Sequence, residues 1–200
     1  MTQRRDAVDN ILSLHKACPE AVVWSRTQPN LEAAWQSLTY PDWALWALDT
    51  FGYRDARKLR QFAAVCAARS KALWDDPACA QAIAVAERAA AGTVSPEELL
   101  AAYLATRKAA QAIIDRPDYS EAMVGAAAAA VGCLHEHPME AAMQASRESA
   151  RAIAWDPGTD SSWDEEGSFQ CEELRRIIGP DVDPLIAEVR KSNRGMLRVL

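Results

Sequence analysis

The histidine pair at His135 and His137, with Glu136 between them, is the first group in the sequence whose residue types could bind a metal. Metal sites on helices place their ligands three or four residues apart, as in His-Glu-x-x-His, because such residues share a helix face. His135 and His137 are only two residues apart, so they would not share a helix face. His15 is the only other histidine, and it lies far away in the sequence. We therefore expect a solvated loop at residues 135–137, and we predict no metal site.

Nucleophilic catalysis needs a cysteine or serine beside a base, and the sequence offers no such pair at a suitable spacing. Cys133 lies two residues before His135, a spacing that separates the two side chains on a helix. The five cysteines form no Cys-x-x-Cys pair, so we expect reduced, mostly buried thiols. Glycine-rich phosphate-binding motifs are missing from the sequence as well. These observations predict that the chain is not an enzyme and needs no cofactor.

Four cations lie within the seven residues from Arg54 to Arg60, and such a cluster could bind an acidic partner or a phosphate group. Arg54, Arg57 and Lys58 are the candidate partner-binding residues in this cluster. The alternative is a solvated helix face on which Asp55 pairs with its neighbours. Cations at the start of a helix oppose its dipole, so the cluster carries a small cost in stability.

An acidic segment from Asp156 to Glu166 surrounds a single tryptophan and suits a basic protein surface. Its charge would steer the encounter and the indole would anchor the contact, although acidic loops are also common without any partner. The candidate partner-binding residues in this segment are Asp156, Asp160, Trp163, Asp164, Glu165 and Glu166.

Alanine-rich segments with apolar residues at helical spacing must position these groups. Alanine favours helix more than any other residue, and small side chains let helices approach closely while the seven tryptophans fill wider gaps. Asn30, Asp76 and Ser95 are expected helix caps, and the glycine and alanine run at 125–130 should pack against another helix. The sequence therefore predicts an all-α protein, as a multi-helix bundle or as a stacked antiparallel αα-array.

Two further patterns refine this organisation. An Ala-x-Arg pattern recurs around Arg69, Arg88, Arg107 and Arg147, and we expect these arginines to form an internal ladder with Glu87, Glu148 and other carboxylates. In the C-terminal part, Gly179-Pro180 should end one helix and Asp183-Pro184 should begin the last one. The predicted division is a helical domain over 1–155, an acidic loop over 156–168, and a helical extension over 169–200 that packs on the same core.

Charge and hydropathy restrict the partners. Lys and Arg number 22 against 28 Asp and Glu, which gives a formal charge of −6 and argues against direct binding to nucleic acid. No apolar run approaches the length of a membrane span, and the N-terminus lacks an apolar signal core, so we expect a cytoplasmic protein without membrane contact. A homodimer is left open.

Ordered landmarks between residues 10 and 155 resemble a known family. An Arg-Lys-Leu-Arg element leads into Phe-Ala-Ala-Val-Cys-Ala at residues 57–67, and Asp76-Pro77 precedes Val-Ala-Glu-Arg-Ala-Ala at residues 85–90. With the tryptophans that precede them, these segments resemble the alanine-rich helical immunity proteins of bacteria and phages. The resemblance implies a helical protein that binds and neutralises a toxin or another antagonistic effector, and it implies no particular site residues.

The leading hypothesis from the sequence is a non-enzymatic, immunity-like binding protein that neutralises its target by protein–protein contact. The alternative is a phage-encoded inhibitor of a bacterial defence complex, such as an anti-CRISPR, whose acidic surface mimics nucleic acid.

Overall fold

The computed structural model describes residues 8–158 and 161–196, and these residues form helices and no strands. The all-α prediction is thus confirmed. In chain order the helices are α1 (Val8–Leu14), α2 (Pro19–Ser25), α3 (Leu31–Ser37), α4 (Pro41–Thr50), α5 (Ala56–Arg69), the 3-10 helix η1 (Lys71–Leu73), α6 (Pro77–Ala90), α7 (Pro96–Gln111), the 3-10 helix η2 (Ala112–Asp115), α8 (Glu121–Gly132), α9 (Pro138–Ala154) and α10 (Trp163–Met196).

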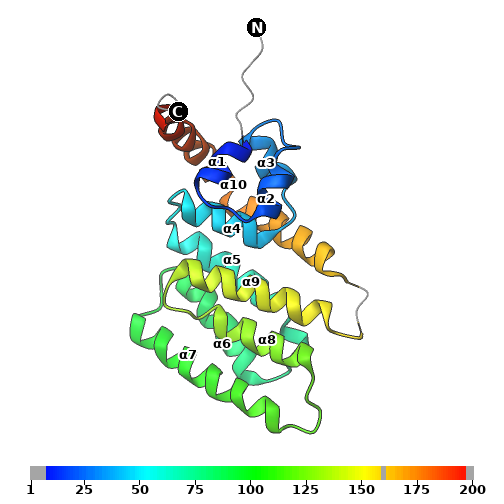
Figure 1. The fold of residues 1–200 in the computed structure, drawn as a ribbon. Helices are drawn as coiled ribbons and strands as arrows, with labels where there is room; N and C mark the ends of the chain where they lie inside the picture. Colours follow the sequence, from blue (N-terminus) through cyan, green and yellow to red (C-terminus); the bar gives the residue numbers. More distant parts are fainter. Residues whose placement is uncertain (1–7, 159–160, 197–200) are drawn as a thin grey trace.

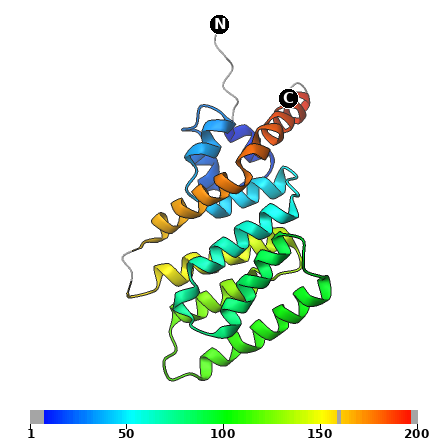
Figure 2. The same ribbon diagram turned by 180° about the vertical axis from the view of Figure 1, so that it is seen from behind.

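The helices lie in stacked layers, with α1 to α3 at one end of the molecule and α7 at the other (Figures 1 and 2). Helix α9 lies in the middle and packs against α4, α5, α8 and α10. The apolar core is continuous from Val8 in α1 to Val189 in α10. Within the described residues, no helix is long and apolar enough to cross a membrane.

Side-chain caps fix several helix starts, as the sequence predicts. The Oδ1 atom of Asn30 accepts from the backbone N–H of Ala33 at 2.8 Å, and Asp76 accepts from Ala78 N–H at the same distance. Ser95 Oγ accepts from Glu98 N–H at 3.1 Å. Each cap satisfies a backbone donor that has no partner inside its own helix, so the turns between the short helices are set locally.

The smooth surface of α8 lies against α9, and two glycines bring the helices close together. A Cβ atom added to Gly125 would lie 2.9 Å from both the Cα and N atoms of Ala152. A Cβ atom added to Gly132 would lie 2.9 Å from Cβ of Gln144. The alanines between these glycines include the buried Ala126 and Ala130. Because the contact at Gly125 involves backbone atoms, no side-chain rotation can make room for a larger residue there.

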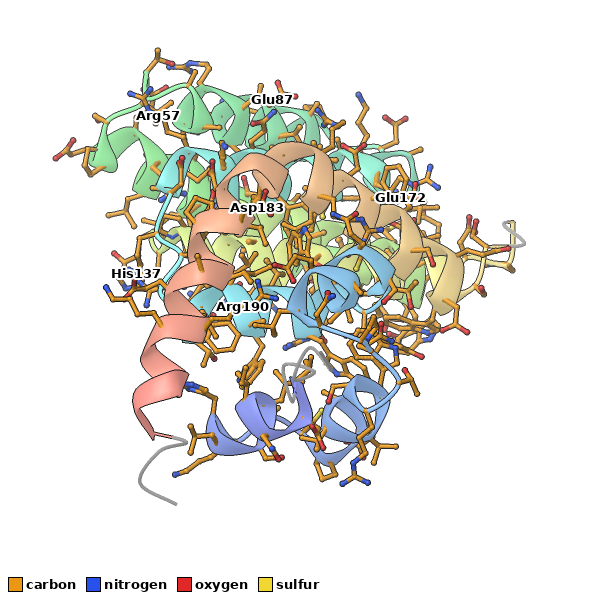
Figure 3. All side chains as sticks on the ribbon, turned by 90° about the horizontal axis from the view of Figure 1, so that it is seen from above. Arg57, Glu87, His137, Glu172, Asp183 and Arg190 are labelled. Atoms are coloured by element: carbon orange, nitrogen blue, oxygen red, sulfur yellow. The ribbon has the colours of Figure 1, made fainter. Side chains whose placement is uncertain are left out.

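Helix α10 runs without interruption through Pro180 and Pro184, so the predicted break at Gly179-Pro180 is wrong. Figure 3 shows that the helix instead bends near Asp183, as expected where prolines remove backbone hydrogen bonds. Burial compensates for this cost. One apolar stripe at a spacing of four residues continues across the bend, and its members, all buried, are Leu174, Ile178, Val182 and Ile186.

The recurrent arginines do not form the predicted ladder with Glu87 and Glu148. Arg69 pairs with Glu166 at 3.1 Å, Arg88 with Glu98 at 2.7 Å, and Arg147 with Asp42 at 3.5 Å. The latter two pairs lie on the surface, where such contacts contribute little to stability. The arginines therefore connect separate pairs of helices and do not stack along the molecule.

We predict that Gly125→Ala destabilises the protein by about 1–3 kcal/mol, because the added methyl group collides with the backbone of α9. This sign is the opposite of the effect in an exposed helix, where Gly→Ala stabilises. Urea denaturation followed by circular dichroism measures the change.

Gly158→Ala serves as the control for this prediction. A Cβ atom at Gly158 would meet only the flexible side chain of Asp156, at 3.3 Å, so a small change is expected. Equal effects of the two substitutions would refute the close backbone contact between α8 and α9.

Candidate protein-binding surface

The acidic segment divides into residues that face solvent and one that does not. Helix α10 begins at Trp163, so part of the predicted loop is helical. Trp163 is 47% exposed, Asp164 and Glu165 are exposed, and Glu166 is only 1% exposed. Asp160 lies outside the described residues. Glu166 therefore cannot contribute a surface carboxylate to a partner.

Glu166 instead belongs to a buried polar network that joins three helices. Arg69 Nε donates to Glu166 Oε2 at 3.1 Å, and Gln170 Nε2 donates to Glu166 Oε1 at 3.2 Å. Gln170 Oε1 accepts from Ser146 Oγ at 2.5 Å, while its Nε2 also donates to the Ser146 carbonyl at 3.1 Å. Burial raises the pKa of the Glu166 carboxyl, although the hydrogen bonds from Gln170 and Arg69 act in the opposite direction. The network fixes α10 against α5 and α9.

Two other carboxylates in the segment have local structural roles. Ser162 and Glu165 form a capping box: Glu165 N–H donates to Ser162 Oγ at 3.3 Å, and Ser162 N–H donates to Glu165 Oε2 at 2.9 Å. Asp156 Oδ1 accepts from Gly158 N–H at 3.0 Å and shapes the turn after α9. Glu165 is nevertheless exposed in the first turn of α10, where its negative charge suits the positive end of the helix dipole.

The basic cluster mostly contacts other parts of the same chain. Arg54 Nη1 pairs with Asp49 Oδ1 at 3.0 Å, and Lys58 Nζ pairs with Asp181 at 2.8 Å. Arg60 donates to the backbone carbonyls of His135 and Glu136 at 2.9 and 2.6 Å. Arg54 and Lys58 therefore have partners within the chain, although the Arg54 side chain is 65% exposed, and their role in partner binding stays a prediction.

Lys58 belongs to a small cluster that fastens the bend of α10 to α5. Asp181 accepts from Lys58 Nζ and, at 2.9 Å, from the hydroxyl of Tyr53. The hydrogen bond from Lys58 lowers the pKa of Asp181, and burial together with the neighbouring carboxylate raises the pKa of Tyr53. Arg57 is exposed and lies beside Gly92 in the turn after α6 (Figure 3). It stays apart from the acidic segment, because Arg69, at the far end of α5, is the residue that meets Glu166.

The start of α8, the end of α9 and the start of α10 lie on one side of the molecule (Figures 1 and 2), and an exposed aromatic residue lies at or next to each of these helix ends. Tyr119 is 44% exposed and Trp155 is 46% exposed, values close to that of Trp163. The Arg151 guanidinium lies over the Trp155 ring at 4.4 Å, a cation–π contact that holds the indole at the surface. We name Tyr119, Arg151, Trp155 and Trp163 the aromatic edge.

A chain of polar contacts across α8 and α9 connects Tyr119 to Arg151, whose guanidinium lies over Trp155. Glu121 Oε1 accepts from the Tyr119 hydroxyl at 3.0 Å, and Glu121 Oε2 pairs with Arg151 Nη2 at 3.2 Å. Arg151 also pairs with Glu148 one turn earlier, at 3.5 Å. These contacts restrict the side chains before any partner arrives, which reduces the entropy lost on binding.

Sequence reasoning identified Trp163 but missed Tyr119, Arg151 and Trp155. These three residues come from two distant segments, and only the packing of α8 on α9 brings them together. One signal was available: Trp155 is a bulky aromatic residue at the end of an alanine-rich helix, directly before the turn at Asp156-Pro157-Gly158.

The residues considered for metal binding and catalysis lie mostly in one turn and in the buried core. His135, Glu136 and His137 occupy the turn between α8 and α9, and no group of three potential metal ligands occurs in the part of the chain that the structure describes. Cys66, Cys79, Cys133 and Cys171 are buried free thiols, and Cys18 is exposed. Burial raises the pKa of Cys79 to about 11 and that of Cys171 to about 12, so these thiols are poor nucleophiles near neutral pH.

A depression of about 550 Å³ lies between the turn before α7 and the turn after α8. Arg60, Ser95 and His135 line it, but each already has a partner in the chain. Arg60 donates to two carbonyls, Ser95 caps α7, and His135 Nδ1 accepts from the N–H of His137 at 3.2 Å. These three polar side chains are therefore already hydrogen-bonded within the chain, and the depression is a weak candidate for a ligand site.

Comparisons with protein-family models, with curated proteins and with solved structures found no match to this chain. The resemblance to immunity proteins therefore stays a prediction.

We predict that lowering the pH from 7 to about 4.5 stabilises the wild type relative to Glu166→Gln. The folded pKa of Glu166 is raised, so the folded state binds a proton that the unfolded state releases in this interval. Stability due to this group therefore falls as pH rises through the interval. Urea denaturation of both proteins at several pH values measures the difference.

Asp164→Asn removes one negative charge from an exposed position in the same helical turn and is the matched control. If the difference in the free energy of unfolding between wild type and Glu166→Gln stays constant across this pH range, the buried carboxylate does not titrate as proposed.

Proposed function

We propose that this protein acts by binding another protein and that the aromatic edge is its contact surface. The observation that carries this proposal is that Tyr119, Trp155 and Trp163 are all exposed at helix ends on one side of the molecule, with Arg151 stacked on Trp155. Tyr, Trp and Arg are the residue types that dominate the binding energy of protein interfaces. An isolated exposed aromatic residue needs no explanation, but three from separate segments form an anchor.

The charge around the aromatic edge favours a basic partner. Asp156, Asp164 and Glu165 lie next to or near Trp163 in the sequence, and the whole chain carries a formal charge of −6. Such a field attracts a cationic surface over a distance of about 8–10 Å at ordinary salt concentration and speeds the encounter. Affinity would then come from the desolvated aromatic side chains at the centre of the contact.

Neutralisation of a toxin or another effector is the biological role that fits this surface best. The resemblance to immunity proteins supports this role, and the contact requires neither a cofactor nor a metal. We place the encounter in the cytoplasm. The nucleic-acid mimic receives less support, because Glu166 is buried and Glu165 and Asp156 hold local backbone groups.

We predict that Trp163→Ala and Trp155→Ala each weaken partner binding by at least tenfold, because each removes an aromatic anchor from the centre of the contact. Tagged wild-type and variant proteins are used to capture partners from a host lysate at two salt concentrations, and the captured proteins are identified by mass spectrometry. The affinity of a partner found in this way is then measured by titration calorimetry.

Leu104→Ala is the matched control, because Leu104 is 53% exposed on α7, away from the aromatic edge. A partner that the wild type and Leu104→Ala retain, but that both tryptophan variants lose, supports the proposal. A partner that all four proteins bind equally would show that the contact lies elsewhere. Higher salt should slow association with a basic partner.

A further inference from the structure

A second feature, separate from the aromatic edge, is the outer face of α7. This helix forms one end of the stack, and both ribbon views show no other described helix on its outer side (Figures 1 and 2). On its inner side α7 packs against α6 and α8, where Leu99 and Thr106 are buried. Leu100 and Leu104, one turn apart, are each more than half exposed. The end of the stack therefore presents two large apolar side chains to solvent.

The residues of this outer face follow a fixed order along the helix. Glu97 lies in the first turn, Ala101 and Leu104 lie in the middle, and Lys108 lies in the last turn. All four are exposed, and their spacings of four, three and four residues place them on one face. The face thus begins acidic, is apolar at its centre and ends basic.

The charges at the two ends of this face are available to a second molecule. Hydrogen bonds from its own backbone N–H and from Ser95 lower the pKa of Glu97, so its carboxylate is ionised near neutral pH. Lys108 and the adjacent Arg107 are exposed. Within the described chain neither has an ion-pair partner, whereas arginines before and after α7 do. A carboxylate from another molecule could therefore pair with the basic end of α7.

The order of residues on α7 is complementary to itself when a second copy runs in the opposite direction. Glu97 and Lys108 lie equally far from the midpoint between residues 102 and 103, and so do Ala101 and Leu104. A two-fold axis at this midpoint therefore places Glu97 opposite Lys108 of the second copy and Ala101 opposite Leu104 of the second copy, and it generates each contact twice. Parallel helices would instead place like charges together.

We propose that two copies of this chain form an antiparallel, two-fold symmetric dimer through the outer face of α7. At the centre each Leu104 packs on the small Ala101 of the second copy. A shallow depression lined by Leu104, Arg107, Lys108 and Gln111 follows on the same face and receives Leu100 of the second copy. The Glu97–Lys108 pairs at both ends fix the direction and register of the two helices.

The size of α7 limits the strength of this dimer. The helix has 16 residues. Stable complexes usually bury about 800 Å² on each partner, and one face of one helix offers less than this. We therefore expect a reversible dimer with a dissociation constant of about 10–100 μM. Higher salt should weaken it, because its charge pairs lie at the exposed ends of the contact.

The test is sedimentation velocity of the full chain, at concentrations from well below to well above this range. Lys108→Glu sets acid against acid and Glu97→Lys sets base against base, so each variant alone should dimerise at least tenfold more weakly than wild type. An equimolar mixture of the two variants restores both charge pairs in a mixed dimer. We expect this mixture to associate about as well as the wild type.

Lys71→Glu is the matched control, because it changes the net charge as Lys108→Glu does, at an exposed position on η1, and should dimerise as the wild type does. Leu104→Ala should weaken the dimer. It should still retain the partner of the aromatic edge, which contains no residue of α7, so failure of one proposal is distinguishable from failure of the other. Circular dichroism checks that each variant is folded.

Three outcomes would overturn the proposal. The first is a wild type that stays monomeric over the whole concentration range, a result that needs no variant to fold. The second is dimerisation of Lys108→Glu and Glu97→Lys at wild-type strength, which would place the contact elsewhere. The third is a mixture of the two folded variants that stays monomeric, which would contradict the antiparallel pairing.

Discussion

The close approach of α8 to α9 is the constraint on which most of this molecule depends. Gly125 leaves room for the backbone of α9 at Ala152, and the alanines around it extend the contact. Because α9 also packs against α4, α5 and α10, its position determines where these helices lie as well. The same approach brings Glu121 within reach of Arg151 and thereby links Tyr119 to Trp155 in the aromatic edge. The position of the large side chains of Tyr119 and Trp155 thus depends on the glycine and alanine contact between α8 and α9.

Charged residues illustrate how much of the molecule could be read from the sequence. The helical class followed from alanine content and from caps such as Asn30 and Ser95, whose interactions are local in the chain. The burial of Glu166 could not be predicted in the same way. Its partner Arg69 is distant in the sequence, and the preceding residues Asp164 and Glu165 face solvent. Helical spacing alone could separate these three residues only if the start of α10 were known.

The predicted helix break at Gly179-Pro180 was wrong for a different reason. Local preference favours a helix break at Gly179-Pro180, but tertiary burial of Leu174, Ile178, Val182 and Ile186 on one stripe opposes it. Packing against both the α5–α9 layer and the N-terminal helices decides the outcome, and the prolines leave only a bend. The aromatic edge lay beyond sequence reasoning for a related reason, because Tyr119 and Trp155 meet only through the contact of two helices.

The bent helix α10 also affects how the protein is made. It is synthesised after all the other described helices, yet its second half supplies the aliphatic side of the core that faces Trp24, Trp35, Trp43 and Trp46. Helices α8 and α9 can pack on each other as soon as they leave the ribosome, because they are neighbours in the chain, and α5 has been made by then and can receive α9. The tryptophan-rich N-terminal helices must wait with an uncovered apolar face until α10 emerges. During that interval the nascent chain offers chaperones a well-defined surface to protect.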